Sequence, residues 1–244
     1  MHHEQIDIIT HDGTCPSHLF TPGDGARGPA VIFYMDAGGI RPALLDMAAR
    51  LAQAGYVVLL PDMFYRFGPY GPLVPAEVFA GDFRAILGPM VATTGNEAAA
   101  ADTEAFLAVL AGRPDVSGTR CGAVGFCMGG GMAITAAGRW PARFAAAASF
   151  HGGNLATDAP GSPHLLAPAL QAELHIGAAQ NDASYPPAMA ERFEAALTAA
   201  GVHFAARTYP AAHGWMMPDF PVHDVGAAEV GWHELLDLFG RTLR

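Results

Sequence analysis

The chain has 244 residues, of which 51% are hydrophobic and 15% are charged, and its formal net charge is -10 at pH 7. This balance is typical of a folded protein with a sizeable apolar core, and it excludes a disordered chain. Because 23 Asp and Glu outnumber 13 Lys and Arg, no basic block is left for a phosphate backbone, and we expect no nucleic-acid partner.

The first predicted elements form a hairpin. Residues 5–10 and 14–20 alternate between apolar and polar side chains, and the turn residues 11–13 separate them. This pattern predicts an antiparallel pair of strands at the N-terminus. Residues 30–34 follow as a short apolar run bounded by turn residues, which is typical of a strand buried on both faces of a sheet.

Helical and strand patterns alternate along the rest of the chain. The predicted helices are residues 42–54, 98–110, 128–137, 187–200 and 225–242, and the predicted strands are residues 56–60, 121–125, 145–150, 174–178 and 204–209. Such alternation predicts an α/β fold with a mostly parallel central sheet flanked by helices on both faces. No repeat or long linker divides the pattern, so we expect a single domain over residues 1–244.

A segment rich in aromatic residues, 63–75, interrupts this alternation. Its four aromatic side chains are those of Phe64, Tyr65, Phe67 and Tyr70. The segment is too irregular for a helix or strand and too apolar for an idle linker. We expect Tyr65 and Arg66 of this segment, together with Trp215, to border a substrate pocket. Plain core packing of the aromatic residues and a solvated position for Arg66 are the alternatives.

The most informative motif is the sequence GFCMG at residues 125–129, where a predicted strand gives way to a helix. It has the form of a nucleophile elbow, a strained turn that exposes its central side chain, here Cys127. Glycine is needed at 125 and 129, because a Cβ there would strike the neighbouring strand or helix. The N-terminus of the following helix favours a thiolate. A buried structural cysteine is the alternative.

A cysteine nucleophile needs a base and an orienting acid, and a candidate for each follows a predicted strand. His213 lies in a glycine-flanked loop after the strand at 204–209, and Asp182 follows the strand at 174–178. The order nucleophile, acid, histidine is the one expected for an α/β-hydrolase, whose site lies at the carboxyl ends of the strands. For Asp182 the alternative is an ordinary loop aspartate that caps a helix.

Further candidates follow other strands of the predicted sheet. The loop after the first core strand contains Asp36 and Ala37, and the amides of Ala37 and Met128 are the expected oxyanion donors. We expect Asp36 to gate Cys127, because a nearby carboxylate alters the ionisation of a thiol. His151 directly follows a strand and either lines the site or makes a structural hydrogen bond.

The cysteines and histidines favour neither disulfides nor metal. Cys15, Cys121 and Cys127 are too few and wrongly spaced for a disulfide framework or a zinc site. No histidine pair has the spacing of a metal-binding helix, and we expect no metal and no cofactor. Because the sequence contains no signal-like start and no window of ~18 apolar residues, we expect a cytoplasmic protein without a membrane span. Its expected state is a monomer or a small homo-oligomer.

With these motifs, the chain resembles the dienelactone hydrolase family of α/β-hydrolases, in which a Cys-His-Asp triad opens lactone rings. The likeness covers nearly the whole chain and rests on the sequences GFCMGG, AAQND followed by prolines, YPAAHGW and PDMFYR. The resemblance implies Cys127 as nucleophile, Asp182 as orienting acid and His213 as base, with the Ala37 and Met128 amides as oxyanion donors.

The chain departs from the family's pattern at two positions. The best-known members have a glutamate that engages the resting thiol where this chain has Asp36, whose side chain is one methylene shorter. They also bind a substrate carboxylate with an arginine four residues after the catalytic histidine, where this chain has Met217. Without that cation, a preference for an acidic lactone should weaken, because a buried carboxylate needs a paired donor.

The sequence therefore predicts a hydrolase that cleaves a carboxylic ester or lactone, a small-molecule substrate, through Cys127. Two alternatives stay open. One is an esterase for neutral esters with no preference for lactones. The other is a non-catalytic member of the fold that binds a ligand while its thiol stays protonated.

Overall fold

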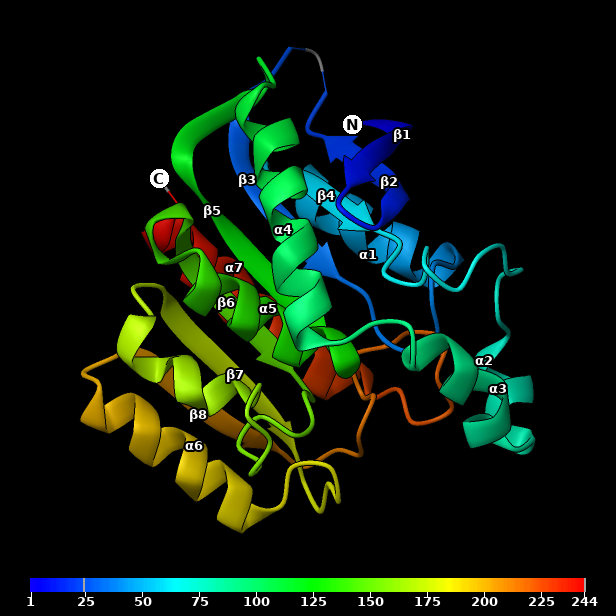
Figure 1. Ribbon diagram of the computed structural model, residues 1–244, viewed down its shortest axis with the longest axis vertical. Coiled ribbons are helices and arrows are strands. Elements are labelled where there is room, and N and C mark those ends of the chain that lie inside the picture. The colour runs from blue at the N-terminus through cyan, green and yellow to red at the C-terminus, as the bar shows by residue number, and fades with distance from the viewer. Residues whose placement is uncertain (24, 244) are drawn as a thin grey trace.

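One mixed sheet runs through the computed structural model, which describes residues 1–23 and 25–243 (Figure 1). Arg244, the last residue of the expected domain, lies outside the described residues, as does Asp24. The strands are β1 (His2–Thr10), β2 (Gly13–Thr21), β3 (Gly28–Tyr34), β4 (Val57–Pro61), β5 (Val116–Phe126), β6 (Phe144–Phe150), β7 (Glu173–Ala179) and β8 (Phe204–Tyr209). The helices are α1 (Pro42–Gln53), α2 (Pro75–Ala80), α3 (Phe83–Val91), α4 (Asn96–Ala111), α5 (Met128–Arg139), α6 (Pro187–Ala199) and α7 (Val225–Thr242).

The strands are ordered β1-β2-β4-β3-β5-β6-β7-β8 across the sheet. β1 and β2 form the predicted antiparallel hairpin, closed by the pair Thr10 and Gly13, and β2 lies antiparallel to β4. From β4 to β8 all neighbouring strands are parallel. The predicted α/β-hydrolase fold, with its mostly parallel sheet, is confirmed. Because the carboxyl ends of β3 to β8 meet at one edge, the loops that follow these strands lie together there.

Helices cover both faces of the sheet (Figure 1). α4, α5 and α6 lie on the near face in this view, and α1 and α7 lie on the far face. The far pair is tied together at the surface by an ion pair from Arg50 of α1 to Glu229 of α7. On the near face α5 packs against β3, β5 and β6, so the helix that follows Cys127 crosses the middle of the sheet.

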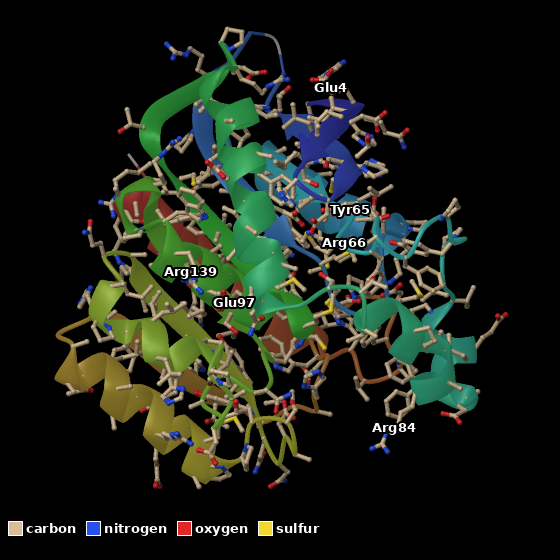
Figure 2. The ribbon with its side chains drawn as sticks, in the orientation of Figure 1. Glu4, Tyr65, Arg66, Arg84, Glu97 and Arg139 are labelled. Carbon is tan, nitrogen blue, oxygen red and sulfur yellow. The ribbon has the colours of Figure 1, made fainter. Side chains whose placement is uncertain are left out.

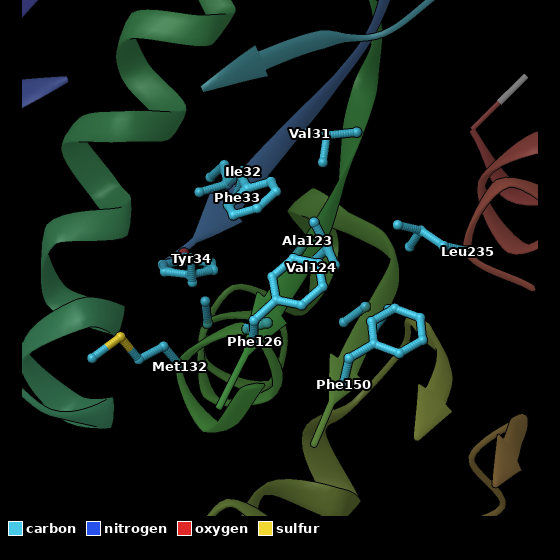
Figure 3. Close-up of a cluster of buried hydrophobic side chains, with 14 of the residues drawn as sticks. Val31, Ile32, Phe33, Tyr34, Ala123, Val124, Phe126, Met132, Phe150 and Leu235 are labelled. Carbon is cyan, nitrogen blue, oxygen red and sulfur yellow. The ribbon is translucent and has the colours of Figure 1, made fainter. Parts of the chain in front are cut away.

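The core forms where β3 and β5 are covered on both faces (Figure 3). Phe33 and Phe126 are fully buried, and their ring centroids lie 4.9 Å apart. Met132 of α5 and Leu235 of α7 reach this cluster from opposite faces of the sheet. Burial of nearly all of β3 and of residues 121–126 of β5 explains why these stretches appear in the sequence as apolar runs.

The helices α2 and α3 were not expected from the sequence. Both are short, α2 begins at Pro75, and α3 is capped by Asp82, whose side chain accepts hydrogen bonds from two amides. Exposed Phe79 and Phe83 blur the apolar periodicity that would have indicated helices here. No helix in the described part of the chain is long and apolar enough to cross a membrane.

Candidate active site

Cys127 occupies a strained turn between β5 and α5. Its φ of 53 and ψ of -116 lie outside the regions that side chains favour, a cost of roughly 1–3 kcal/mol. The flanking glycines permit this turn, because a Cβ on Gly125 would lie 1.8 Å from the Gly129 carbonyl oxygen. A Cβ on Gly129 would lie 2.2 Å from the Tyr34 carbonyl oxygen. The turn therefore has the close backbone contacts that the sequence motif predicts.

Residues at the end of β6 accept hydrogen bonds from the same turn. The Cys127 amide donates to the Phe150 carbonyl oxygen and to Nδ1 of His151, both at 3.1 Å. His151 is fully buried, and its ring lies edge-on to that of His213, with centroids 5.3 Å apart. Burial, followed by the charge of His213, lowers the pKa of His151 well below its usual value. A neutral His151 thus serves as acceptor for the amide of Cys127.

The three residues of the predicted triad are brought together from the ends of β5, β7 and β8. Nε2 of His213 lies 3.1 Å from Sγ of Cys127, and Nδ1 of His213 lies 2.6 Å from Oδ2 of Asp182. Cys127 is partly exposed, whereas Cys15 and Cys121 are buried. This accessibility does not fit a purely structural role for Cys127.

The electrostatics of this chain favour a charged His213. Burial alone would lower the pKa of His213, but its hydrogen bonds to Asp182 and Cys127 outweigh burial and raise that pKa to about 10. Burial would raise the pKa of Asp182, but hydrogen bonds from His213 and Ser184 lower it to about 2. At neutral pH His213 is therefore an imidazolium, and it lies between the sulfur of Cys127 and the carboxylate of Asp182.

Ser184 is a contributor that the sequence interpretation missed. Its hydroxyl donates to Oδ1 of Asp182 at 2.6 Å, and its amide donates to the same oxygen at 2.8 Å. The amide of Asn154, in the loop after β6, donates to the Ser184 carbonyl oxygen at 2.7 Å. The spacing Asp-x-Ser is that of an Asx-turn, and it is the one signal in the sequence that points to this contact.

The two expected oxyanion donors lie on loops that pack against each other. A Cβ on Gly129 would come within 2.6 Å of the Met35 carbonyl oxygen, so the loop after β3 rests on the first turn of α5. Within the described residues, neither the Ala37 amide nor the Met128 amide donates to another protein group. Both are thus free to donate to a substrate oxygen, and their role as oxyanion donors stays a prediction.

Asp36 is held by an arginine that the sequence interpretation did not single out. Both of its carboxylate oxygens accept hydrogen bonds from Arg41, each at 2.9 Å, and both side chains are buried. Among the described residues, Asp36 makes no hydrogen bond to Cys127. These contacts do not support the expected gating of the thiol, because the carboxylate is already committed to a cation.

The other expected pocket residues lie in different surroundings. The Tyr65 hydroxyl and the Arg66 guanidinium both donate to Asp102 of α4, so these two side chains tie the aromatic segment to that helix (Figure 2). Trp215 is fully buried and packs on Tyr209, with ring centroids 4.1 Å apart. Their expected contact with substrate stays a prediction that these contacts do not favour.

The aromatic segment does shape a cavity. It has a volume of about 300 Å³ and is lined by Tyr65 and Tyr70 together with Asp62 and the start of β2. No residue of the triad lines it. The cavity is therefore separate from the cluster of Cys127, His213 and Asp182.

A central parallel sheet with a cysteine in a strained turn after β5, a carboxylate after β7 and a histidine after β8 is the arrangement of an α/β-hydrolase. Comparison with known proteins identifies the family within this class. The chain belongs to the dienelactone hydrolase family, whose model it matches over residues 16–243. The predictions of the family and of an enzyme that hydrolyses a carboxylic ester or lactone are thereby confirmed.

Relatives and solved structures agree with this assignment. A protein of Methylorubrum extorquens described as "Putative carboxymethylenebutenolidase" is 28% identical over 243 residues, which cover 96% of this chain and 79% of the relative. A protein of Synechocystis with the same description is 28% identical, and the match covers 98% of this chain and 99% of the relative. The crystal structure of a "Putative Dienelactone Hydrolase" from Klebsiella pneumoniae superposes with a TM-score of 0.85 at 22% identity, covers 98% of both chains and shows the same fold.

Proposed function

We propose that this enzyme hydrolyses neutral carboxylic esters or lactones by covalent catalysis at Cys127. The observation that carries this proposal is the continuous chain of contacts from Cys127 Sγ through the His213 ring to Asp182, at 3.1 Å and 2.6 Å. The strained elbow adds support, because a costly conformation at a partly exposed nucleophile is typical of functional sites. A thiolate paired with an imidazolium is a reactive nucleophile at neutral pH.

In the first half of the reaction, the Cys127 thiolate attacks the carbonyl carbon and a C–S bond forms. The carbonyl oxygen becomes an oxyanion, which accepts hydrogen bonds from the Ala37 and Met128 amides. The tetrahedral intermediate then collapses, the C–O bond to the leaving oxygen breaks, and His213 gives that oxygen its proton. An acyl-thioester and a neutral imidazole result.

In the second half, the neutral His213 accepts a proton from water as the water oxygen attacks the thioester. The C–S bond breaks, the carboxylic acid leaves, and the Cys127 thiolate and the His213 imidazolium are restored. Asp182 holds one ring orientation and stabilises the imidazolium in both halves. For a lactone the leaving oxygen stays attached to the acyl group, so a single hydroxy acid is released.

The preference for a neutral substrate is supported by where the cations lie. Met217, four residues after His213, is fully buried. Arg41 and Arg66 are each committed to two carboxylates. Arg84 of α3 points away from the body of the molecule (Figure 2). Arg41 and Arg66 thus have no free guanidinium for a substrate carboxylate, and Arg84 points elsewhere, so burial of that carboxylate would be uncompensated by these arginines.

Hydrolysis of a short p-nitrophenyl ester by the wild type, Cys127→Ser and Cys127→Ala tests the nucleophile. We expect turnover to fall to background in Cys127→Ala, while iodoacetamide labels Cys127 of the wild type. Burial raises the pKa of the Cys15 and Cys121 thiols to about 12, so both serve as internal controls that stay unlabelled. Undiminished turnover in Cys127→Ala would refute the mechanism, and an inert thiol without turnover would favour a ligand-binding protein.

A matched pair of lactones, one neutral and one bearing a carboxylate, tests the substrate class. We expect kcat/KM for the neutral lactone to exceed that for the acidic one by about tenfold or more, the cost of an unpaired charge. A preference for the acidic lactone would contradict this part of the proposal. The expected cytoplasmic location, the single domain and the monomeric or small homo-oligomeric state stay predictions.

A further inference from the structure

A buried arginine outside the triad joins the two loops that flank it. The Arg41 side chain is 1% exposed, and all five of its N–H donors have acceptors. Two donate to Asp36 at 2.9 Å each, and one donates to the Gly39 carbonyl oxygen at 3.1 Å. The remaining two donate to the carboxylate of Asp219, at 2.6 Å and 3.1 Å.

These acceptors belong to loops that are far apart in the sequence. Asp36 and Gly39 lie in the loop after β3, which contains the Ala37 amide. Asp219 lies in the loop after β8, which begins with the segment that carries His213. Arg41 itself is the N-cap of α1, where Pro42 begins the helix, so its backbone is anchored to a regular element.

The contact to the second loop continues as far as the histidine. The Arg41 guanidinium lies 5.2 Å from the centroid of the Phe220 ring. A Cβ on Gly214 would lie 2.7 Å from that ring, so Phe220 packs directly on the residue that follows His213. Arg41 is therefore connected, through Asp219 and Phe220, to the backbone next to His213.

Stability alone does not explain a charge cluster of this kind. Burial opposes the charge on Arg41, but the hydrogen bonds to Asp219 and Asp36 raise its pKa, so the side chain stays cationic. Well-packed apolar residues of similar volume often stabilise a fold at least as well as a buried ion pair does. What a guanidinium with five satisfied donors adds is a fixed geometry between its partners.

We propose that Arg41 is a positioning residue that holds the loop of the Ala37 amide in register with the loop of His213. The proposal rests on the function proposed above, since it concerns the oxyanion donor and the base of that reaction. Formation of the oxyanion needs both groups at once, and a shift of either loop by a fraction of an ångström weakens catalysis.

Two variants cut the link without leaving a buried charge alone. Asp219→Ala removes the acceptor on the second loop, and because Asp219 is 29% exposed we expect the fold to tolerate the change. Arg41→Lys keeps the positive charge beside Asp36, but an ammonium cannot span two carboxylates in the fork geometry of a guanidinium. The control is Arg50→Met, which breaks another two-bond arginine–carboxylate pair on the same helix, with Glu229 at the surface.

Ester hydrolysis and amide hydrogen exchange are measured on all of these variants. We expect kcat to fall about tenfold in Asp219→Ala and in Arg41→Lys, with KM changed by less than about twofold, because positioning acts on the transition state. Exchange should quicken at residues 38–40, whose amides are hydrogen-bonded in the wild type, in Asp219→Ala, although the substitution lies in the other loop. The double variant that combines Arg41→Lys with Asp219→Ala should have the same kcat as the less active of the two single variants. Arg50→Met should have the kcat of the wild type.

Unchanged kcat together with unchanged exchange at residues 38–40 in Asp219→Ala would overturn the proposal. So would a loss of kcat in Arg50→Met equal to that in Arg41→Lys, because the effect would then be one of general stability. If the wild type hydrolyses no ester at all, the proposed function fails. The exchange measurement then still decides whether Arg41 joins the two loops.

Discussion

Ser184 donates its hydroxyl to Oδ1 of Asp182 at 2.6 Å, while His213 binds the other carboxylate oxygen, Oδ2. The two contacts together fix the carboxylate plane, and with it the plane of the imidazole ring. The Ser184 amide also donates to Oδ1, so the loop after β7 supplies both bonds on that side.

Replacing this serine tests how strongly the carboxylate depends on it. We expect Ser184→Ala to lower kcat about three- to tenfold, the equivalent of one ordinary hydrogen bond, because the Ser184 amide still donates to the same carboxylate oxygen. Ser184→Thr keeps the hydroxyl and should restore most of the activity. The measurement is steady-state hydrolysis of a p-nitrophenyl ester. Equal activity in Ser184→Ala and the wild type would mean that the Ser184 amide alone orients Asp182.

The pH dependence follows from the raised pKa of His213. A group whose pKa is raised by folding contributes stability below its ordinary pKa and loses that contribution as the pH rises through the raised value, here about 10. An alkyl ester is the right substrate, because its poor leaving group needs the proton of His213. We therefore expect kcat/KM, which reports ionisations of the free enzyme, to decline as the pH approaches 10.

Asp182→Asn should move this alkaline decline to lower pH. The substitution removes the charged acceptor that helps to raise the pKa of His213, whereas the contact with Cys127 is kept. At the acid end the lowered pKa of Asp182, about 2, means that its contribution to stability is lost only as the pH falls through that value. A decline at the same pH in both proteins would show that another group controls the alkaline limb.

His151 offers a test of the support beneath the nucleophile. Its Nδ1 accepts the Cys127 amide, and its own φ of 40 is one that asparagine adopts more readily than most residues. We expect His151→Asn, which places a carbonyl oxygen near the same position, to keep kcat within about threefold, and His151→Leu to lose about tenfold or more. Equal losses in the two variants would contradict a role as hydrogen-bond acceptor, and thermal unfolding serves as the control for stability.

We expect substitution of an elbow glycine to lower the stability of the fold, whatever its effect on catalysis. Gly125→Ala would bring a Cβ within 1.8 Å of the Gly129 backbone, so we expect a loss of roughly 3 kcal/mol or more in the free energy of unfolding. Gly112→Ala is the matched control, since its Cβ would meet nothing closer than 3.6 Å. Urea unfolding measures both. A stable Gly125→Ala would mean that the start of α5 can shift.

The proximity of Cys127, His213 and Asp182 could be predicted from the sequence because each of them closely follows a strand. Local patterns locate β5, β7 and β8, and the parallel sheet then brings their carboxyl ends together. The glycine spacing around Cys127 is likewise local, since the contact it permits is between Gly125 and Gly129. Short-range patterns of this kind can be recognised in a single sequence.

Contacts between distant loops could not be predicted in this way. Arg41 and Asp219 are 178 residues apart, and no local pattern pairs them. The direction of a side chain in an irregular segment is equally hidden, which is why Tyr65 was expected at a substrate pocket although its hydroxyl binds Asp102 of α4. Asp36 was located on the correct loop, but its partner depended on which cation the fold brings near.

Arg66 provides the last test, because a structural role and a substrate role predict different results. Its guanidinium binds Asp102, whose side chain is only 1% exposed, so removal would leave a buried carboxylate without its cation. We expect Arg66→Met to lower the free energy of unfolding by about 3 kcal/mol, the usual cost of breaking a buried ion pair.

The same variant should leave the selectivity between a neutral and an acidic lactone unchanged, because the Arg66 guanidinium is already occupied by Asp102 and Asp12. Arg84→Met is the control for a solvent-facing arginine of the neighbouring helix α3 and should alter neither property. If Arg66→Met instead raised KM for the acidic lactone alone while unfolding stayed unchanged, Arg66 would be a substrate ligand, and the expectation formed from the sequence would be correct.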